Sequence, residues 1–295
     1  MIAARLEQLT PNSAARTTMP SSVGPLAALD AGSADAVATV LLLPGYTGSK
    51  EDFAPILDPL ADNGYRAIAI DLPGQFESSG PLDEADYSPL ALGAVCAEVV
   101  RDLAQHSPVV LLGHSFGGLV ARGAVLAGAP IAGLVLLCSG PGALSDGARH
   151  DALLAAEPML RLHGKELVYD NAVAGARAAR KVVPPEVAEL LRRRFIASTE
   201  VGLLGMGATL QTEPDRVAEL RAVLDGAHTP VAVIAGRDDD AWTLPGQDGM
   251  ARRLGTELVI VEQSAHSPAV ENPDGLLAVL LPLLRSWRSS MLRTR

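Results

Sequence analysis

A serine between two glycines is the clearest sign of chemistry in this chain. The segment Gly113–Gly117 has the pattern G-x-S-x-G and places Ser115 between an apolar run at residues 108–112 and a stretch of helical spacing. Such a strand-to-helix turn is strained, and the positions two before and two after the serine must be small to avoid collision. The turn raises the hydroxyl clear of the sheet, beside the free N–H groups of the next helix. Ser115 is therefore the candidate nucleophile; the alternative is a packing turn with an incidental serine.

A serine nucleophile needs a base, and histidine is the usual one. Among the six histidines, His266 follows an apolar segment at residues 257–261. It therefore emerges at the same carboxyl edge of the predicted sheet as Ser115, where catalytic groups gather in open α/β sheets. The others precede predicted strands, fall in a helical insertion or lie within the turn itself: His106, His228, His150, His163 and His114. We therefore predict that His266 is the base.

Three consecutive carboxylates are candidates for the acid that orients this base. Asp238, Asp239 and Asp240 follow an apolar segment at residues 229–235 and leave the same edge of the sheet. One of them can accept the N–H of His266 and stabilise the imidazolium that forms during attack. The remaining carboxylates then belong to a solvated acidic turn, and the residues alone do not select among the three.

The segments around these residues alternate between apolar strands and amphipathic helices. The predicted strands are residues 37–43, 65–70, 108–112, 131–137, 229–235 and 257–261. The predicted helices are residues 52–63, 88–103, 116–127, 185–195 and 272–289. This alternation indicates βαβ units and a parallel sheet covered on both faces. Between about residues 142 and 214 we predict helices and no strand, and this insertion is too helical to be a loop.

The composition narrows the classes of protein further. The chain has 295 residues, 48% of them hydrophobic, so it is long enough to bury a large core. A net charge of −10 without a basic run argues against nucleic acid as a partner. No apolar stretch reaches the roughly 18–20 residues that span a bilayer, and we see no secretory signal. Cys96 and Cys138 lie in apolar segments without metal-ligand spacing, which predicts reduced, buried thiols, no metal site and a cytoplasmic location.

Taken together, these segments resemble the α/β-hydrolase fold superfamily, with the order Ser…Asp…His. The resemblance covers about residues 34 to 290 and rests on residues 43–48, 71–74, 113–118, 236–242 and 264–268. It implies an α/β fold with a mostly parallel β-sheet flanked by helices and a helical cap inserted after the fourth central strand. The implied divisions are an N-terminal arm with the first edge strands (1–33), the first part of the core (34–143), the cap (144–213) and the second part of the core (214–295).

The resemblance also implies roles for particular residues. In similar proteins the acid falls three residues after the glycine that closes its strand, which favours Asp239 over Asp240. The oxyanion hole of the family implies the backbone N–H groups of Phe116 and Tyr46. Most relatives carry His-Gly just before the latter position, whereas this chain carries Pro-Gly. The backbone donor survives that change, and a histidine side chain is absent there.

The cap and the acid turn supply candidates for the substrate pocket. Leu203 and Met206 lie in a glycine-spaced apolar segment that suits an acyl pocket or a lid, although core packing explains it equally well. Trp242, beside the acidic turn, is a second candidate wall.

The resemblance implies a serine hydrolase of small or medium carboxylic esters that works through an acyl-enzyme, without cofactor. The expected partner is a small molecule with an apolar acyl or alcohol part, and a homodimer is left open. Two kinds of alternative remain. One is another reaction on the same residues: thioesterase, lactonase, carbon–carbon bond hydrolase or cofactor-free perhydrolase. The other is a slow or inactive hydrolase-like protein that binds a small ligand.

Overall fold

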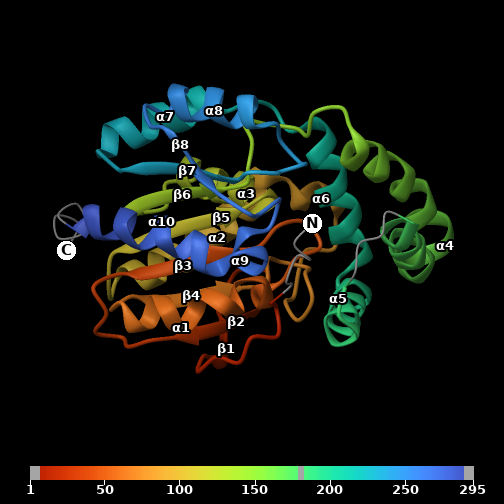
Figure 1. Ribbon diagram of the computed structural model, residues 1–295, viewed down its shortest axis with the longest axis horizontal. Helices are drawn as coiled ribbons and strands as arrows, with labels where there is room; N and C mark the ends of the chain where they lie inside the picture. Colours follow the sequence, from red (N-terminus) through yellow and green to blue (C-terminus); the bar gives the residue numbers. More distant parts are fainter. Residues whose placement is uncertain (1–6, 179–182, 289–295) are drawn as a thin grey trace.

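The computed structural model describes residues 7–178 and 183–288, which form one eight-stranded sheet between two layers of helices (Figure 1). The strand order is β1-β2-β4-β3-β5-β6-β7-β8. The pairs β1–β2 and β2–β4 are antiparallel, and the five remaining pairs are parallel. The predicted mostly parallel sheet flanked by helices is thus confirmed.

The strands are β1 (Ala15–Met19), β2 (Leu26–Ala31), β3 (Thr39–Leu43), β4 (Arg66–Ile70), β5 (Val109–His114), β6 (Gly133–Leu137), β7 (Val231–Gly236) and β8 (Leu258–Val261). The core helices are η1 (Lys50–Phe53), α1 (Ala54–Asp62), η2 (Glu84–Tyr87), α2 (Pro89–Ala104), α3 (Phe116–Leu126), α7 (Val217–Ala227), α8 (Leu244–Arg253), α9 (Pro268–Glu271) and α10 (Pro273–Ser286). Between β6 and α7 come α4 (Ala148–Ala178), α5 (Pro185–Ala197) and α6 (Glu200–Thr212).

Successive side chains of each central strand point to opposite faces of the sheet and pack in a separate apolar layer on each face. In β3, Leu41 and Leu43 pack with α2, α3, α7 and α8 on one face of the sheet, whereas Val40 and Leu42 pack with α1, α9 and α10 on the other (Figure 1). Both faces are therefore covered, which explains why these strands are continuous apolar runs in the sequence. Cys96 and Cys138 are free and buried in these layers.

Two core helices, α7 and α8, were not predicted. Helix α7 buries Val217, Leu220 and Leu224, a helical spacing that was available in the sequence. Helix α8 has a weaker pattern, because glycines interrupt it and only three of its residues are buried: Gln247, Met250 and Ala251. Thr243 caps its first turn by accepting the N–H of Gly246, which stabilises the helix.

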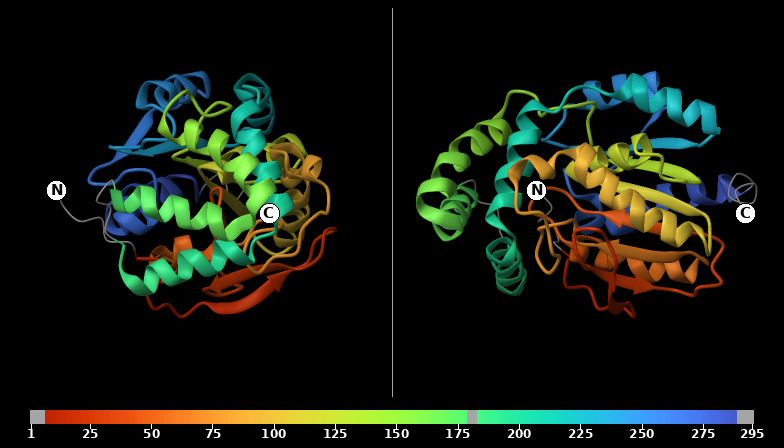
Figure 2. Two further views of the ribbon diagram at one scale, coloured as in Figure 1. Left: turned by 90° about the vertical axis from the view of Figure 1, so that its right-hand side faces the viewer. Right: turned by 180° about the vertical axis from the view of Figure 1, so that it is seen from behind.

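The helices α4, α5 and α6 form a cap after β6, the fourth parallel strand of the chain. They lie together beyond the carboxyl ends of the parallel strands, and the left view of Figure 2 looks onto α4 and α5. Helix α4 is broken at Gly164, where φ is 79°. No helix in residues 7–178 and 183–288 is both long and apolar enough to cross a membrane.

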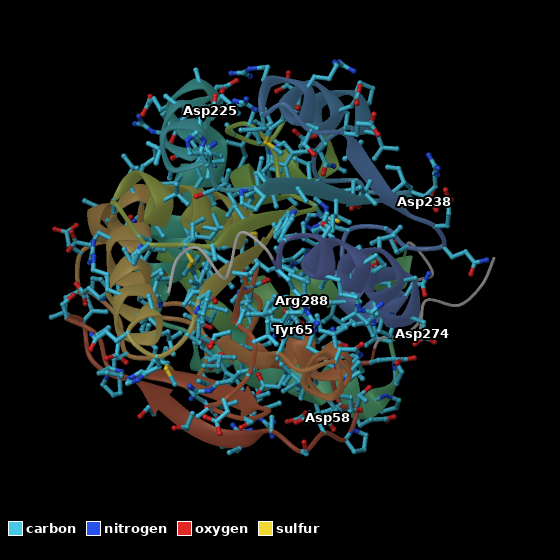
Figure 3. All side chains as sticks on the ribbon, turned by 90° about the vertical axis from the view of Figure 1, so that its left-hand side faces the viewer. Asp58, Tyr65, Asp225, Asp238, Asp274 and Arg288 are labelled. Carbon is cyan, nitrogen blue, oxygen red and sulfur yellow. The ribbon has the colours of Figure 1, made fainter. Side chains whose placement is uncertain are left out.

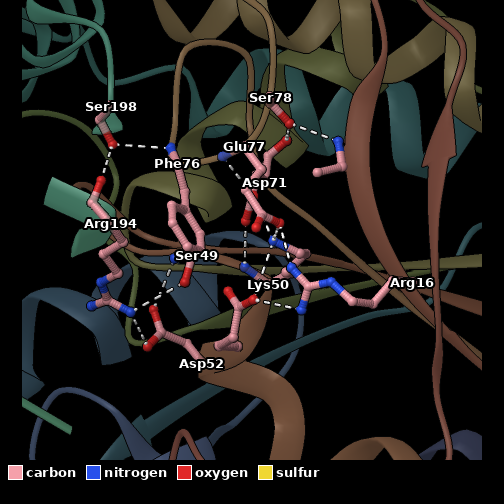
Figure 4. Close-up of polar contacts among 12 residues, drawn as sticks. Arg16, Ser49, Lys50, Asp52, Asp71, Phe76, Glu77, Ser78, Arg194 and Ser198 are labelled. Atoms are coloured by element: carbon pink, nitrogen blue, oxygen red, sulfur yellow. Dashed lines mark hydrogen bonds and ion pairs between the residues drawn. The ribbon is translucent and has the colours of Figure 1, made fainter. Parts of the chain in front are cut away.

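Polar contacts tie the cap to two loops of the core (Figure 4). Arg194 of α5 donates to Asp52 of η1 at 2.7 Å. At the start of α6, the Ser198 hydroxyl accepts the N–H of Phe76 at 3.0 Å, and the Thr199 N–H donates to the Gly74 carbonyl at 2.8 Å. The cap therefore rests on the loops that follow β3 and β4.

Candidate active site

The turn between β5 and α3 has the strained geometry that its sequence predicts. Ser115 sits at φ 55° and ψ −122°, a conformation that side-chain-bearing residues rarely adopt. A Cβ added to Gly113 would lie 2.2 Å from the Gly117 carbonyl oxygen, and one added to Gly117 would lie 2.4 Å from that of Leu43. Only glycine fits at these two positions, and the hydroxyl is held at the N-terminus of α3.

Three loops bring the predicted serine, histidine and one aspartate together. His266 Nε2 lies 2.9 Å from Ser115 Oγ, and His266 Nδ1 lies 2.8 Å from Asp239 Oδ1. The residues follow β5, β7 and β8, whose carboxyl ends meet at one edge of the sheet. Such a chain of hydrogen bonds can move a proton from the hydroxyl to the imidazole while the carboxylate stabilises the imidazolium.

The three consecutive aspartates have three different environments. The Asp239 side chain is fully buried and also accepts the Ala241 N–H and the Gln247 side-chain amide, at 3.0 and 2.8 Å. Asp240 is exposed and pairs with Arg149 of the cap, and Asp238 is exposed at the rim of the molecule (Figure 3). Burial is the largest single influence and would raise the pKa of Asp239, but the hydrogen bond and charge of His266, together with the bonds from Ala241 and Gln247, outweigh burial and lower it. Asp239 therefore remains a carboxylate at neutral pH.

The two backbone N–H groups implied for the oxyanion hole lie beside Ser115. A Cβ added to Gly45 would lie 3.0 Å from Ser115 Cβ and 3.4 Å from its Oγ, so the turn that carries Tyr46 touches the serine. Phe116 is the first residue of α3 and has no helical partner for its N–H. Within the described residues, neither the Phe116 nor the Tyr46 N–H has an acceptor. Both donors are available to an incoming oxygen.

A cavity of about 960 Å³ separates the cap from the core and opens onto Ser115 and His266. Its cap side is mainly apolar, with Leu160, Leu203 and Leu204 forming a packed cluster. The hydroxyl of Tyr46 donates to the Leu203 carbonyl at 3.0 Å, so the phenol connects the turn after β3 to α6. Burial raises the pKa of Tyr46 and keeps it protonated.

Of the three predicted pocket residues, the structure brings only Leu203 to the cavity. Met206, three residues further along α6, is fully buried and packs in the core cluster. Trp242 is 2% exposed, packs on Gly140 and donates its indole N–H to backbone carbonyls. Neither lines the cavity.

The glycines of α6 serve close packing. A Cβ added to Gly202 would lie 2.9 Å from the Tyr87 ring, and one added to Gly205 would lie 2.5 Å from the Glu84 carbonyl oxygen. They allow α6 to approach η2. Gly207 is different because it lies on the cavity wall near Tyr46.

Three groups with metal-ligating atoms meet here: Cys138, Asp239 and His266, whose ligand atoms lie within 4.8 Å of one another. However, the carboxylate and the imidazole already bond each other. Burial raises the pKa of the Cys138 thiol, and a thiol ligand must be deprotonated to bind a metal. The chemistry of the cluster suits a histidine–aspartate pair better than a metal site.

His114 takes part in the site, although its position within the turn argued against it as the base. Its Nε2 donates to the His266 carbonyl at 2.6 Å, and the two rings lie 5.0 Å apart. Burial, followed by the charge of His266, lowers the pKa of His114 from 6.5 to about 4. The neutral ring therefore supports the loop that carries the base.

We expect His114 to make folding pH-dependent between about 6.5 and 4. The unfolded chain takes up this proton first, so stability is lost as the pH falls through this window, by on the order of 3 kcal/mol. Chemical denaturation at several pH values should show a flatter dependence for His114→Gln than for the wild type. His106→Gln, at an exposed position, is the control, and an unchanged slope for His114→Gln would contradict the expectation.

Comparison with known proteins places this geometry in a family. Residues 40–279 match the family model described as the alpha/beta hydrolase family. The chain belongs to the alpha/beta hydrolase family. It is thus a hydrolase by family, and the recognition and fold that the sequence suggested are confirmed.

Individual relatives of this alpha/beta hydrolase differ in activity. Over 246 residues it is 27% identical to a Bacillus subtilis (strain 168) protein that is named as a candidate 2-succinyl-6-hydroxy-2,4-cyclohexadiene-1-carboxylate synthase. This match covers 79% of the present chain and 85% of the Bacillus protein. A thermophilic esterase from Thermogutta terrifontis superposes with a TM-score of 0.72 at 21% identity, covering 94% of this chain and 100% of the esterase. An N-acyl homoserine lactonase superposes with a TM-score of 0.72 at 20% identity, covering 92% and 98%. The two solved structures share the fold with this hydrolase.

Proposed function

We propose that this hydrolase cleaves small or medium carboxylic esters through an acyl-enzyme on Ser115. The observation that carries the proposal is the hydrogen-bonded chain from Ser115 through His266 to Asp239, which lies beside the cavity between the cap and the core. A hydroxyl becomes nucleophilic when a base within hydrogen-bond reach accepts its proton.

The proposed reaction begins when Ser115 Oγ attacks the ester carbonyl and His266 Nε2 takes its proton. Asp239 holds the Nδ1–H of the imidazolium. The N–H groups of Tyr46 and Phe116 donate to the oxyanion, where preformed donors stabilise the developing charge without reorganising. His266 then returns its proton to the departing alcohol, activates a water that attacks the acyl group, and finally reprotonates Ser115. These residues complete the cycle without a cofactor.

The proposed substrate carries an apolar acyl or alcohol part. Support comes from the apolar wall of the cap, including Leu160, Leu203 and Leu204, and from a cavity volume typical of small-molecule sites. A lactone is a cyclic ester, so the same residues would open it. Helices α4–α6, within residues 144–213, would exclude water from the acyl group. A cytoplasmic location remains a prediction from the sequence, which leaves a homodimer open.

Labelling with a fluorophosphonate tests the proposed nucleophile. We expect intact-mass analysis to show one label on the wild type and none on Ser115→Ala. Ser139→Ala removes another buried hydroxyl, one with no hydrogen-bond partner in the described residues, and should label like the wild type. A panel of esters, thioesters and lactones of increasing chain length then separates the reactions available to this site. Labelling that survives in Ser115→Ala would contradict the proposal.

A further inference from the structure

The peptide unit between Gly45 and Tyr46 has its two polar groups on opposite sides. The described residues contain no cis peptide bond, so the carbonyl of Gly45 and the N–H of Tyr46 point in opposite directions. The N–H is one of the two free donors beside Ser115. The direction of the carbonyl therefore determines whether this donor faces the reacting oxygen.

A buried side chain from a different loop holds that carbonyl. Gln75 is fully buried, and its Nε2 donates to the Gly45 carbonyl at 2.8 Å. The Gly48 N–H donates to the same oxygen at 3.0 Å and closes a turn. Within that turn Thr47 has φ 59°, which is unfavourable for a β-branched residue. The strained turn is thus supported from outside by the amide of Gln75.

The position of Gln75 is itself well determined. Its Oε1 accepts the Leu72 N–H at 3.2 Å, and its backbone N–H and carbonyl bond Leu72 and Ser78 at 2.9 and 2.8 Å. Both ends of the amide therefore have partners, and a flipped amide would set a donor against a donor and an acceptor against an acceptor.

A buried ion pair joins the same two loops a second time (Figure 4). Asp71, which begins the loop of Gln75, accepts the backbone N–H and the ammonium of Lys50 at 2.7 and 2.8 Å. Burial lowers the pKa of Lys50, but the carboxylates of Asp71, Glu51 and Glu77 together outweigh burial and raise it, so the ammonium stays charged. Two separate contacts therefore join the loops after β3 and β4, and Gln75 makes the one at the carbonyl whose peptide unit carries the Tyr46 N–H.

We propose that Gln75 is a positioning residue of the oxyanion hole, which holds the Gly45 carbonyl so that the Tyr46 N–H faces the oxyanion formed on Ser115. The inference rests on the proposed function. A donor fixed in advance stabilises the transition state more than the bound ester, because full negative charge on the oxygen exists only in the former. Loss of Gln75 should therefore lower kcat and leave KM near its wild-type value.

Two substitutions separate positioning from general stability. Gln75→Glu keeps the acceptor for the Leu72 N–H and sets a carboxylate oxygen against the Gly45 carbonyl, whereas Gln75→Met removes both hydrogen bonds at similar volume. Thr39→Val is the control, because it removes a buried hydrogen bond to Ser107 at the opposite edge of the sheet. For each variant we would measure kcat and KM for one p-nitrophenyl ester, the melting temperature, and the Ki of a trifluoromethyl ketone with the same acyl group. This ketone forms a tetrahedral adduct whose oxyanion occupies the hole.

We expect kcat to fall roughly 10- to 100-fold in the Gln75 variants, more in Gln75→Glu, and the Ki of the ketone to rise by a similar factor. Thr39→Val should change neither quantity. Unchanged kcat and Ki in folded Gln75 variants, equal losses in Thr39→Val, or failure of both Gln75 variants to fold would each overturn the inference. Absence of ester turnover in the wild type would overturn the proposed function and this inference with it, whereas wild-type turnover with unaffected Gln75 variants would overturn this inference alone.

Discussion

Ser115→Ala should lower kcat/KM for esters by roughly 10⁴- to 10⁶-fold, the range seen when a nucleophile is removed from a working serine–histidine–aspartate site. Alanine leaves His266 and Asp239 in place but provides no oxygen to attack the carbonyl. The deleted hydroxyl has one side-chain hydrogen bond within the described residues, to His266 Nε2. Steady-state kinetics and thermal unfolding of the variant would check the result, and the melting temperature should stay near that of the wild type.

Binding by the same variant distinguishes an enzyme from a ligand-binding scaffold. The cavity wall of α4–α6 is unchanged in Ser115→Ala, so an ester that the wild type hydrolyses should still bind and raise the melting temperature. Ser139→Ala should retain full turnover. Undiminished hydrolysis by Ser115→Ala would refute the proposed nucleophile, and a folded wild type that binds esters without turning them over would support the binding protein instead.

Asp239→Asn should lower kcat by roughly 10⁴-fold, whereas Asp240→Asn should have little effect. The two oxygens of Asp239 accept hydrogen bonds from His266, the Ala241 N–H and the amide of Gln247. An amide nitrogen placed at either oxygen would therefore face a donor. If the amide nitrogen faces His266, Nδ1 must accept its hydrogen bond, and the ring proton then lies on Nε2. An Nε2 that already carries a proton cannot take the proton of Ser115.

Asp240→Asn is a matched control because it makes the same chemical change one residue away. Asp240 forms an exposed ion pair with Arg149, and such pairs contribute only about 0–1 kcal/mol. Comparison of kcat for the two variants across pH 6 to 9 would check the assignment. A larger loss of kcat in Asp240→Asn than in Asp239→Asn would contradict the assignment of Asp239 as the acid.

The sequence determined those features of the fold and the site that depend on steric contacts between nearby residues and on the spacing of hydrophobic residues along the chain. The glycines around Ser115 predicted its turn, because a Cβ at either position collides with nearby backbone. Continuous apolar strands predicted a sheet buried on both faces, with strand bounds within about two residues of those observed. The carboxyl-edge rule then placed His266 beside Ser115, since parallel strands end on the same side.

Only the tertiary structure decided which neighbouring side chains face the site. Asp238, Asp239 and Asp240 are identical in type. The family resemblance favoured Asp239 over Asp240, but only the folded chain shows which carboxylate bonds His266, which comes from another strand. Leu203 and Met206 are both apolar residues of α6, and the packing of that helix on the core directs one to the cavity and the other into the interior. The parts played by His114 and Gln75 depend on hydrogen bonds to carbonyls 152 and 30 residues away along the chain. No local pattern encodes such bonds, because the acceptor is a backbone carbonyl that every residue possesses and only the fold brings it within reach.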